Sequence, residues 1–363
     1  MKKKITYVSN SLIPSLQANS VHVINMASSL AKFGALDDFF AYKGFVKKNV
    51  SSLYGLKKNL KIKFYFLSQA PFFNFLEIFF IYFRTNKNSI IFGRNIKICI
   101  FFSFLGSKVI FETHQPISSY TYFERKLFYI FRTRISRIVC ITHALKKILL
   151  KELEIDEKKI HVLPDAANKK KVIKKNKPQK LKKIGYFGSL IKGRGIDIII
   201  LLAKELKEYE FHIAGGNEYL IRKLSNKKLK NIIFHGYLDE DKVVLLRNKM
   251  DVLLAPYQIN TNVQGGKVTS QWMSPLKIFE YMASKKPFIA SDIEVLKEVL
   301  TDNNNCLLVK PNSISEWINA IKKILNDEKM SKKLIENAYK IFEKKYTWDI
   351  RAKKIIDICE EID

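Results

Sequence analysis

The stretch from Ser274 to Glu280 has residue types and spacing that suit the binding of a phosphate group. Ser274 is a good N-cap and Pro275 suits the first helical position, so the sequence predicts a helix that begins here. The backbone amides of Leu276 and Lys277 would then lack acceptors at the positive end of the helix dipole. Such a helix end binds phosphate, and the Lys277 ammonium adds a full positive charge.

Glu280 lies one turn further along this predicted helix, on the face that looks back over the same end. Its carboxylate can accept hydrogen bonds from the diol of a ribose. The segment SKKPFIAS that follows predicts a break and then a buried strand. An ordinary capped helix before a core strand is the alternative interpretation of the whole stretch.

A glycine-containing loop provides the second group of candidate residues. It joins a predicted strand at 184–187 to a predicted helix at 196–206. Basic side chains in this loop, above all Arg194, can neutralise a diphosphate. The alternative is that Arg194 is an ordinary surface arginine. Glycine lets the backbone approach a ligand closely, and the loop contains Gly188, Gly193 and Gly195.

His114 is the third candidate, in the sequence ETHQP after a predicted strand at 108–111. Open α/β sheets place their ligands at the carboxyl ends of strands, which is where this histidine would lie. A histidine in that position could act as an acid or a base, or could contact a substrate. A loop histidine with satisfied hydrogen bonds is the alternative.

The elements that must position these residues alternate between strand and helix. This alternation predicts parallel sheets that are covered on both faces. The length of 363 residues exceeds what a single core usually serves, so we expect two such α/β domains. The predicted strands are residues 5–8, 39–42, 62–66, 89–92, 108–111, 137–141 and 160–163 in the first half, and 184–187, 211–214, 232–235, 250–255 and 287–291 in the second.

The chain opens with a strand, a polar loop and a helix from Val21 to Phe33, which is the first unit of a doubly wound sheet. Ser20 is a plausible N-cap for that helix. The loop lacks the sequence G-x-G-x-x-G, so a dinucleotide site of the usual kind is not predicted.

The charge balance is strongly basic. The chain has 64 Lys and Arg against 34 Asp and Glu, and the net charge of +30 implies an anionic partner such as nucleic acid, acidic lipid or a phosphorylated substrate. No nucleic-acid-binding module is recognisable, so nucleic acid is the weakest of the three. Four scattered cysteines predict free thiols in a reducing cytosol. The N-terminal segment does not read as a signal peptide, and no segment reaches the roughly 18 apolar residues of a spanning helix.

Two aromatic segments also carry basic side chains and could contact a membrane. Residues 71–84 contain seven Phe and Tyr and are the stronger candidate. Residues 120–134 mix aromatic residues with Arg and Lys, and here we favour a core-facing helix with a solvated basic face. The nine lysines between residues 169 and 183 could attract acidic lipid, but a solvated linker is favoured.

The stretch SPLKIFEYMA with the following PFIAS resembles the donor-binding signature of family 4 glycosyltransferases, which are retaining enzymes of the GT-B fold. That family usually has two Glu separated by seven residues, and here Glu280 matches the second while Trp272 stands at the first. The loop after residue 187 resembles the family's Y-x-G-[RS]-L…[KR]-G-x-D segment, with Ser189 and Arg194 at its two key positions. The resemblance covers most of the chain and is dense from Ile184 to Trp348.

The resemblance implies a GT-B fold, with two Rossmann-like doubly wound parallel-sheet domains that face a central cleft. It implies an acceptor-side domain at residues 1–165, a basic linker at 166–182 and a nucleotide-sugar-binding domain at 183–345. A terminal helix at 346–363 would cross back to the first domain. A polar loop at 261–269 could close over the donor.

The resemblance also implies an activity, namely transfer of a sugar from a nucleotide-sugar donor to a glycan, lipid-linked or phosphorylated acceptor, with retention. The expected setting is assembly of a cell-surface polysaccharide or lipopolysaccharide, in the cytoplasm at the inner face of the membrane, with an anionic membrane surface as a further partner. No metal or other cofactor is expected. A catalytically silent protein of the same fold, with Trp272 in place of the first Glu, is the alternative, and a nucleic-acid-binding protein is a weaker one.

Residue roles follow from the matched positions. His114 and Arg194 are the predicted catalytic residues, and Asn19 and Ser20 are predicted on the acceptor side. Tyr237 would lie beside the nucleobase. The predicted donor-binding residues are Gly188, Ser189, Arg194, Tyr237, Ser274, Pro275, Leu276, Lys277 and Glu280.

Overall fold

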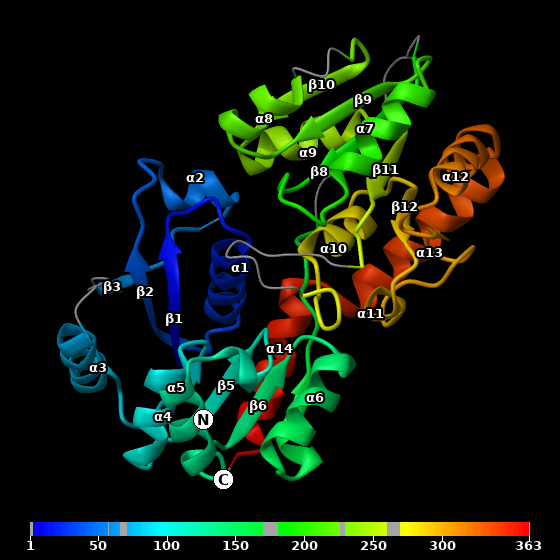
Figure 1. The fold of residues 1–363 in the computed structure, drawn as a ribbon. Helices are drawn as coiled ribbons and strands as arrows, with labels where there is room; N and C mark the ends of the chain where they lie inside the picture. Colours follow the sequence, from blue (N-terminus) through cyan, green and yellow to red (C-terminus); the bar gives the residue numbers. More distant parts are fainter. Residues whose placement is uncertain are drawn as a thin grey trace. The chain divides into compact units, whose positions relative to one another are not determined.

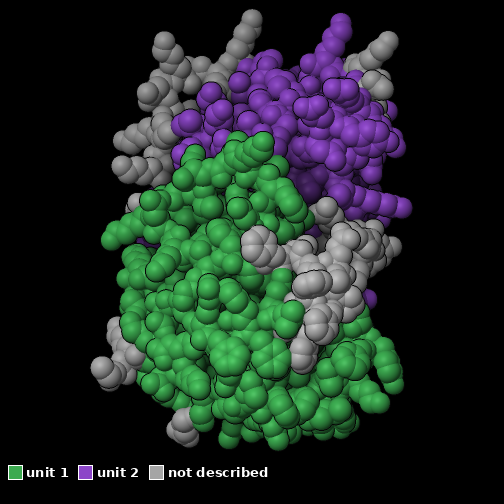
Figure 2. Space-filling view, turned by 90° about the vertical axis from the view of Figure 1, so that its left-hand side faces the viewer, with its two compact units in different colours: residues 1–165, 348–363 green, residues 166–347 purple. Residues whose placement is uncertain are grey.

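The structure is a computed structural model that describes residues 3–56, 58–65, 71–169, 181–225, 229–259 and 269–362, apart from the side chains of residues 71–75. The chain forms two compact units, drawn as a ribbon in Figure 1 and coloured separately in Figure 2. Unit 1 comprises residues 1–165 and 348–363, and unit 2 comprises residues 166–347. Most of the expected basic linker and most of the polar loop at 261–269 lie outside the described residues.

Unit 1 is built on a parallel sheet of seven strands in the order β3-β2-β1-β4-β5-β6-β7. The order changes direction at β1, so right-handed crossovers place helices on both faces of the sheet. The strands are apolar runs because both faces are covered. Their bounds are β1 Ile5–Ile13, β2 Leu36–Lys43, β3 Lys63–Tyr65, β4 Ile90–Gly93, β5 Val109–Thr113, β6 Arg137–Cys140 and β7 Ile160–Val162.

Seven α-helices of the described residues belong to unit 1. The last of them, α14, packs against α1 although more than three hundred residues separate the two in sequence (Figure 1). It therefore contributes side chains to the same core as the first strand. The helices are α1 Ala18–Lys32, α2 Val50–Tyr54, α3 Pro71–Arg84, α4 Ile96–Phe104, α5 Tyr122–Phe131, α6 His143–Leu153 and α14 Trp348–Glu360.

Unit 2 repeats the same plan with a six-stranded parallel sheet in the order β10-β9-β8-β11-β12-β13. Its core packs the sheet against α7 and α12 around the fully buried Trp317. The strands are β8 Lys183–Phe187, β9 Glu210–Ala214, β10 Ile232–Gly236, β11 Val252–Ala255, β12 Phe288–Ser291 and β13 Leu307–Val309. The helices are α7 Ile196–Glu205, α8 Glu218–Ser225, α9 Glu240–Asn248, α10 Leu276–Ala283, α11 Glu294–Lys297, α12 Ile314–Asn326 and α13 Glu328–Lys345.

The predicted strands and the doubly wound fold class are confirmed in both units, but the first loop is not as expected. Strand β1 continues through the first five residues of the predicted loop to Ile13, with a register shift between Val8 and Leu12. Helix α1 begins after Gln17, which makes no side-chain cap. Ser20 is fully buried inside the helix, and its hydroxyl donates to the Leu12 carbonyl at 2.8 Å. The prediction of Ser20 as an N-cap is therefore wrong, because its hydroxyl ties the helix to the strand instead.

Helix α5 also differs from expectation. Its start is fixed by a capping box between Thr121 and Glu124, but Phe128 is its one fully buried residue. The preference for a core-facing helix at residues 120–134 is therefore wrong, because most of the aromatic side chains of α5 point to solvent.

The four cysteines are buried free thiols, as predicted. Among the described residues, none of the helices combines the length and the apolar character required to span a bilayer.

Both sheets reverse their strand order at one place, between β1 and β4 in unit 1 and between β8 and β11 in unit 2. Doubly wound sheets bind ligands outside the carboxyl ends of the strands at such a reversal. Each unit thus has one position in which candidate residues should be sought.

Candidate functional site

The loop after β8 lies at the reversal point of unit 2 and is held tightly against the end of β11. Gly195 has φ +86°, and a Cβ added to it would lie 1.9 Å from the Pro256 carbonyl oxygen, so no larger residue fits there. The Gln258 amide donates to the Gly193 carbonyl at 2.9 Å, and the Tyr186 hydroxyl donates to the Ser189 carbonyl at 2.7 Å. These contacts fix the loop that carries Arg194.

Helix α10 begins one residue later than the sequence predicted. Its N-cap is Pro275, with extended backbone angles and no side-chain cap, and Leu276 is the first helical residue. The prediction of Ser274 as the cap is wrong; Ser274 is instead a buried residue that precedes the helix. The amides of Leu276 and Lys277 remain the first two of the helix, where no intrahelical acceptor exists.

Lys277 points from this helix start into the reversal point. Lys277 is 8% exposed, and its Nζ lies 3.6 Å from the centre of the Tyr186 ring. A Cβ on Gly188 would approach Nζ to 2.9 Å, so the glycine leaves the space that the ammonium occupies. Lys277 Nζ is buried and has no hydrogen-bond partner among the described residues.

Arg194 contacts the same aromatic cluster as Lys277. Its guanidinium carbon is 5.4 Å from the centre of the Tyr257 ring, and Lys277 Nζ is 5.1 Å from that centre. Arg194 Nε is likewise buried with no partner in the described part of the chain. Burial and then the nearby Arg194 charge hold the pKa of Lys277 well below its usual range. A multiply charged anion bound here would offset both the burial of the Lys277 ammonium and its repulsion by Arg194.

Glu280 is held by an arginine that the sequence did not point to. Arg247, from α9, places Nη2 3.1 Å from the Glu280 carboxylate and donates through Nη1 to the Glu280 carbonyl at 3.4 Å. Arg247 is 4% exposed, whereas the Glu280 side chain is 27% exposed. The carboxylate is thus oriented from behind and keeps an accessible side. Arg247 lies in no recognisable motif, so no signal in one sequence could have found it.

The remaining donor-side candidates lie at the edge of this group. Ser189 is exposed in the loop after β8. Tyr237 follows β10 and is 41% exposed, but β9 separates β10 from β8 in the sheet. The structure therefore brings Gly188, Arg194, Lys277 and Glu280 to the reversal point and places Tyr237 two strands away.

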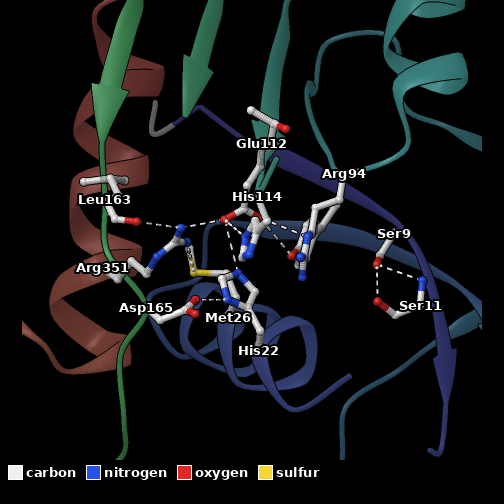
Figure 3. Close-up of polar contacts among 12 residues, drawn as sticks. Ser9, Ser11, His22, Met26, Arg94, Glu112, His114, Leu163, Asp165 and Arg351 are labelled. Atoms are coloured by element: carbon white, nitrogen blue, oxygen red, sulfur yellow. Dashed lines mark hydrogen bonds and ion pairs between the residues drawn. The ribbon is translucent and has the colours of Figure 1, made fainter. Parts of the chain in front are cut away.

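Glu112 is the centre of a buried polar network at the reversal point of unit 1 (Figure 3). It belongs to β5, and its Oε1 accepts from Arg351 Nη2 at 2.5 Å and lies 3.1 Å from His22 Nε2. His22 Nδ1 lies 2.6 Å from the Asp165 carboxylate. Arg94 Nε is 3.8 Å from Glu112 Oε2. In the sequence, Glu112 stands two residues before His114 in the segment ETHQP, and no local pattern links it to its other partners.

Charges in this network are balanced. Burial alone would raise the pKa of Glu112, but Arg351 and His22 outweigh it and hold that pKa well below the usual range. The pKa of Asp165 is also lowered, because His22 overcomes the effect of burial. Both carboxylates are therefore ionised at neutral pH and paired with cationic or hydrogen-bonding groups.

His114 is the accessible member of the network. It follows β5, its Nε2 lies 3.5 Å from Glu112 Oε1, and its side chain is 23% exposed while that of Glu112 is fully buried. Burial and then the Arg94 charge lower the pKa of His114 to about 4, so the ring is neutral at neutral pH. Of the two residues predicted on the acceptor side, Asn19 is exposed at the start of α1, and its side-chain oxygen accepts a hydrogen bond from the hydroxyl of the buried Ser20 at 3.3 Å.

His22, His114 and Asp165 form the group of side chains, within the described ranges, whose geometry could hold a metal ion. Both ring nitrogens of His22 already contact carboxylates, however, and Arg351 and Arg94 supply positive charge beside them. The cluster needs no ion to balance its acids. Asp239 and Asp241, an Asp-x-Asp pair at the start of α9, are not part of this group.

Two doubly wound sheets with a cationic helix start at one reversal point define a GT-B type of glycosyltransferase fold, which is the fold of the solved structures that this chain resembles. Residues 167–341 match the model of the family described as glycosyl transferases group 1. That region contains every donor-side candidate residue. Unit 1 lies outside the residues that match the family model, but the similar solved structures cover both units.

The chain is also similar to proteins of two other organisms. Two uncharacterized glycosyltransferases of Methanocaldococcus jannaschii are 27% and 26% identical, over 49% and 66% of this chain. The matched stretches span only 47% and 64% of the lengths of those relatives. The Anabaena protein HepE, solved with UDP and glucose, is 13% identical with a TM-score of 0.73 and covers 99% of both chains. At that identity the likeness shows the fold alone.

Proposed function

We propose that this chain transfers a sugar from a nucleotide-sugar donor to a glycan, lipid-linked or phosphorylated acceptor, with retention at the anomeric carbon. The observation that carries the proposal is the buried Lys277 ammonium and the half-buried Arg194 guanidinium at the reversal point of unit 2. Lys277 Nζ and Arg194 Nε lie around Tyr257 without hydrogen-bond partners among the described residues. The family match over residues 167–341 and the UDP complex of the Anabaena protein agree with a nucleotide diphosphate as the ligand.

The chemistry of the step explains why these groups are needed. Breaking the bond from the sugar to the diphosphate builds negative charge on the leaving phosphate. Lys277, Arg194 and the amides of Leu276 and Lys277 stabilise that charge, and the Lys277 ammonium is already buried and in place. Because two protein cations serve the diphosphate, we propose that the reaction needs no metal ion.

Glu280 has a different role in this proposal. Its accessible carboxylate accepts hydrogen bonds from the ribose hydroxyls of the donor, while Arg247 fixes its orientation. Arg247 is thus a positioning residue. Ser189 and Tyr237 are proposed as further donor contacts, the latter beside the base.

His114 is proposed as the residue of unit 1 that contacts the donor sugar or the reacting hydroxyl. Its neutral ring can accept a hydrogen bond from a hydroxyl at neutral pH. The Glu112 carboxylate lies 3.5 Å from Nε2 of this ring, and Asn19 is proposed to contact the acceptor.

The setting follows from charge and from the family resemblance. A net charge of +30 suits an acceptor that carries phosphate or is linked to an acidic lipid. We propose assembly of a cell-surface polysaccharide or lipopolysaccharide, on the cytoplasmic side of the membrane.

The test is titration calorimetry and a transfer assay with a panel of UDP-, GDP- and ADP-sugars. We expect one base to bind best, and we expect Lys277→Ala and Arg194→Ala to lose transfer, while Lys204→Ala on the exposed face of α7 keeps it. Arg194→Ala should depress turnover more than affinity. Binding without any transfer would identify a catalytically silent protein, and salt-sensitive binding of nucleic acid without nucleotide-sugar binding would overturn the proposal.

A further inference from the structure

Helix α3 presents a stripe of large apolar side chains to solvent. Leu76, Phe79, Phe80 and Phe83 recur at positions i, i+3, i+4 and i+7, so they share one face of the helix. They are 49%, 36%, 39% and 77% exposed. The packing side of α3 is a different set, in which Ile81 is fully buried and Tyr82 contacts two phenylalanines of α4. This helix therefore has more apolar surface than its own core uses.

Helix α5 has the same character. Tyr122, Phe123, Tyr129 and Ile130 lie on its outer side and are between 44% and 72% exposed, whereas Phe128 is its one buried residue. Side chains at i, i+1, i+7 and i+8 fall on one face of a helix. Helix α5 therefore exposes more large apolar side chains than it buries.

Helix α4 connects the two exposed stripes. Phe101 contacts Phe79 of α3 with ring centres 5.0 Å apart, and Phe104, one turn later, contacts Phe131 of α5 at 5.6 Å. Phe104 is itself 55% exposed and α4 packs against both α3 and α5, so the apolar surface continues over α4. We name this surface the aromatic face and define it as Leu76, Phe79, Phe80, Phe83, Phe104, Leu105, Tyr122, Phe123, Tyr129 and Ile130.

Arginines border the aromatic face and lie flat on its rings. The guanidinium of Arg84 is 4.0 Å from the centre of the Phe80 ring, and that of Arg132 is 3.8 Å from the Tyr129 ring. Between residues 76 and 134 the sequence has nine Lys and Arg and three Glu, and one of those, Glu112, is fully buried. The face is therefore apolar at its centre and basic at its rim.

We propose that the aromatic face docks this protein on an anionic lipid bilayer. Aromatic side chains favour the boundary between headgroups and acyl chains, and arginines beside them bind lipid phosphates. Charge complementarity selects this occupant over a second copy of the chain, because a copy would set one basic rim against another. The surface belongs to unit 1 and uses none of the candidate site residues, so it stands independently of the proposed transfer reaction.

The test is flotation of the full chain with vesicles of phosphatidylcholine alone and of phosphatidylcholine mixed with phosphatidylglycerol. We expect binding to the mixed vesicles, and expect it to weaken with added salt. The double variant Phe83→Ser with Phe123→Ser should bind about a hundredfold more weakly, because two exposed rings lose their insertion into lipid. The matched control is Tyr219→Ser, which removes a 73% exposed aromatic ring of unit 2 and should leave binding unchanged.

Three outcomes would overturn the proposal. They are no binding of the unaltered chain to acidic vesicles, equal binding by the double variant, or a dimer in sedimentation that the double variant abolishes, which would make the face a self-association surface. Since both rings are exposed, the variant should keep the thermal unfolding midpoint and the nucleotide affinity of the unaltered chain. Loss of vesicle binding with intact nucleotide binding, or the reverse, distinguishes this proposal from the proposed function.

Discussion

The two units use the same strand order but place different electrostatics at their reversal points. In unit 1 the acids Glu112 and Asp165 are paired with Arg351 and His22, so the network is balanced without any ligand. In unit 2 the cations Lys277 and Arg194 both lie near the Tyr257 ring, and Lys277 Nζ and Arg194 Nε have no hydrogen-bond partner among the described residues. A balanced buried network stabilises its own unit, whereas an unbalanced one is completed by what binds to it.

The largest effect on stability should come from disrupting the charge-balanced network of unit 1. Glu112→Gln leaves Arg351 and His22 without their carboxylate, and we expect unfolding free energy to fall by about 3–5 kcal/mol, as for other broken buried pairs. Urea unfolding measures this. Glu218→Gln is the control, since that carboxylate is 89% exposed, and equal midpoints for the two variants would contradict the comparison.

The opposite change in stability is expected when the buried cation of unit 2 is removed. Lys277→Met removes an uncompensated buried ammonium, so stability should rise by about 1 kcal/mol. Turnover should fall by about 100- to 1000-fold, because the leaving diphosphate loses a preorganised cation. Steady-state kinetics and urea unfolding on one preparation check both. A variant that loses stability as well as activity would show that the lysine supports the fold.

A smaller effect should follow from releasing Glu280. Arg247→Ala removes the guanidinium that orients the carboxylate, and nucleotide affinity should weaken about tenfold, as for the loss of one charge-assisted hydrogen bond. Glu280→Ala should weaken it by a similar factor. The double variant should then be little worse than either single one, and calorimetry with UDP tests this non-additivity. Additive losses would mean that the two residues act separately.

The smallest expected effect is on the pH dependence of unit 1. The folded-state pKa of His114 is about 4 against an ordinary 6.5, so the neutral ring favours folding above pH 6.5 and that contribution is lost as pH falls from 6.5 towards 4. His114→Gln should flatten the stability profile in this window. Partial exposure of the ring keeps the effect small. Below that pH window, protonation of Glu112 should destabilise the unaltered chain and the His114→Gln variant alike.

The sequence predicted the sheets well because apolar runs separated by turn residues depend on local patterning. It predicted caps poorly: Ser20 and Ser274 both have suitable side chains, but tertiary contacts bury them. Arg351 and Arg247 were missed because their partners lie 239 and 33 residues away in the chain, a relation that local spacing does not record. The outward face of α5 was missed because periodicity gives a helix an apolar side without saying what covers it.

Helix α14 makes the order of synthesis matter for unit 1. Residues 1–165 leave the ribosome long before Arg351, and until then Glu112 lacks the guanidinium that balances it in the finished protein. The sheet of unit 1 therefore stays incomplete, with the Glu112 carboxylate not yet paired with Arg351, while unit 2 is translated. Folding of unit 1 is thus completed late, when the C-terminal helix has been synthesised and packs onto it.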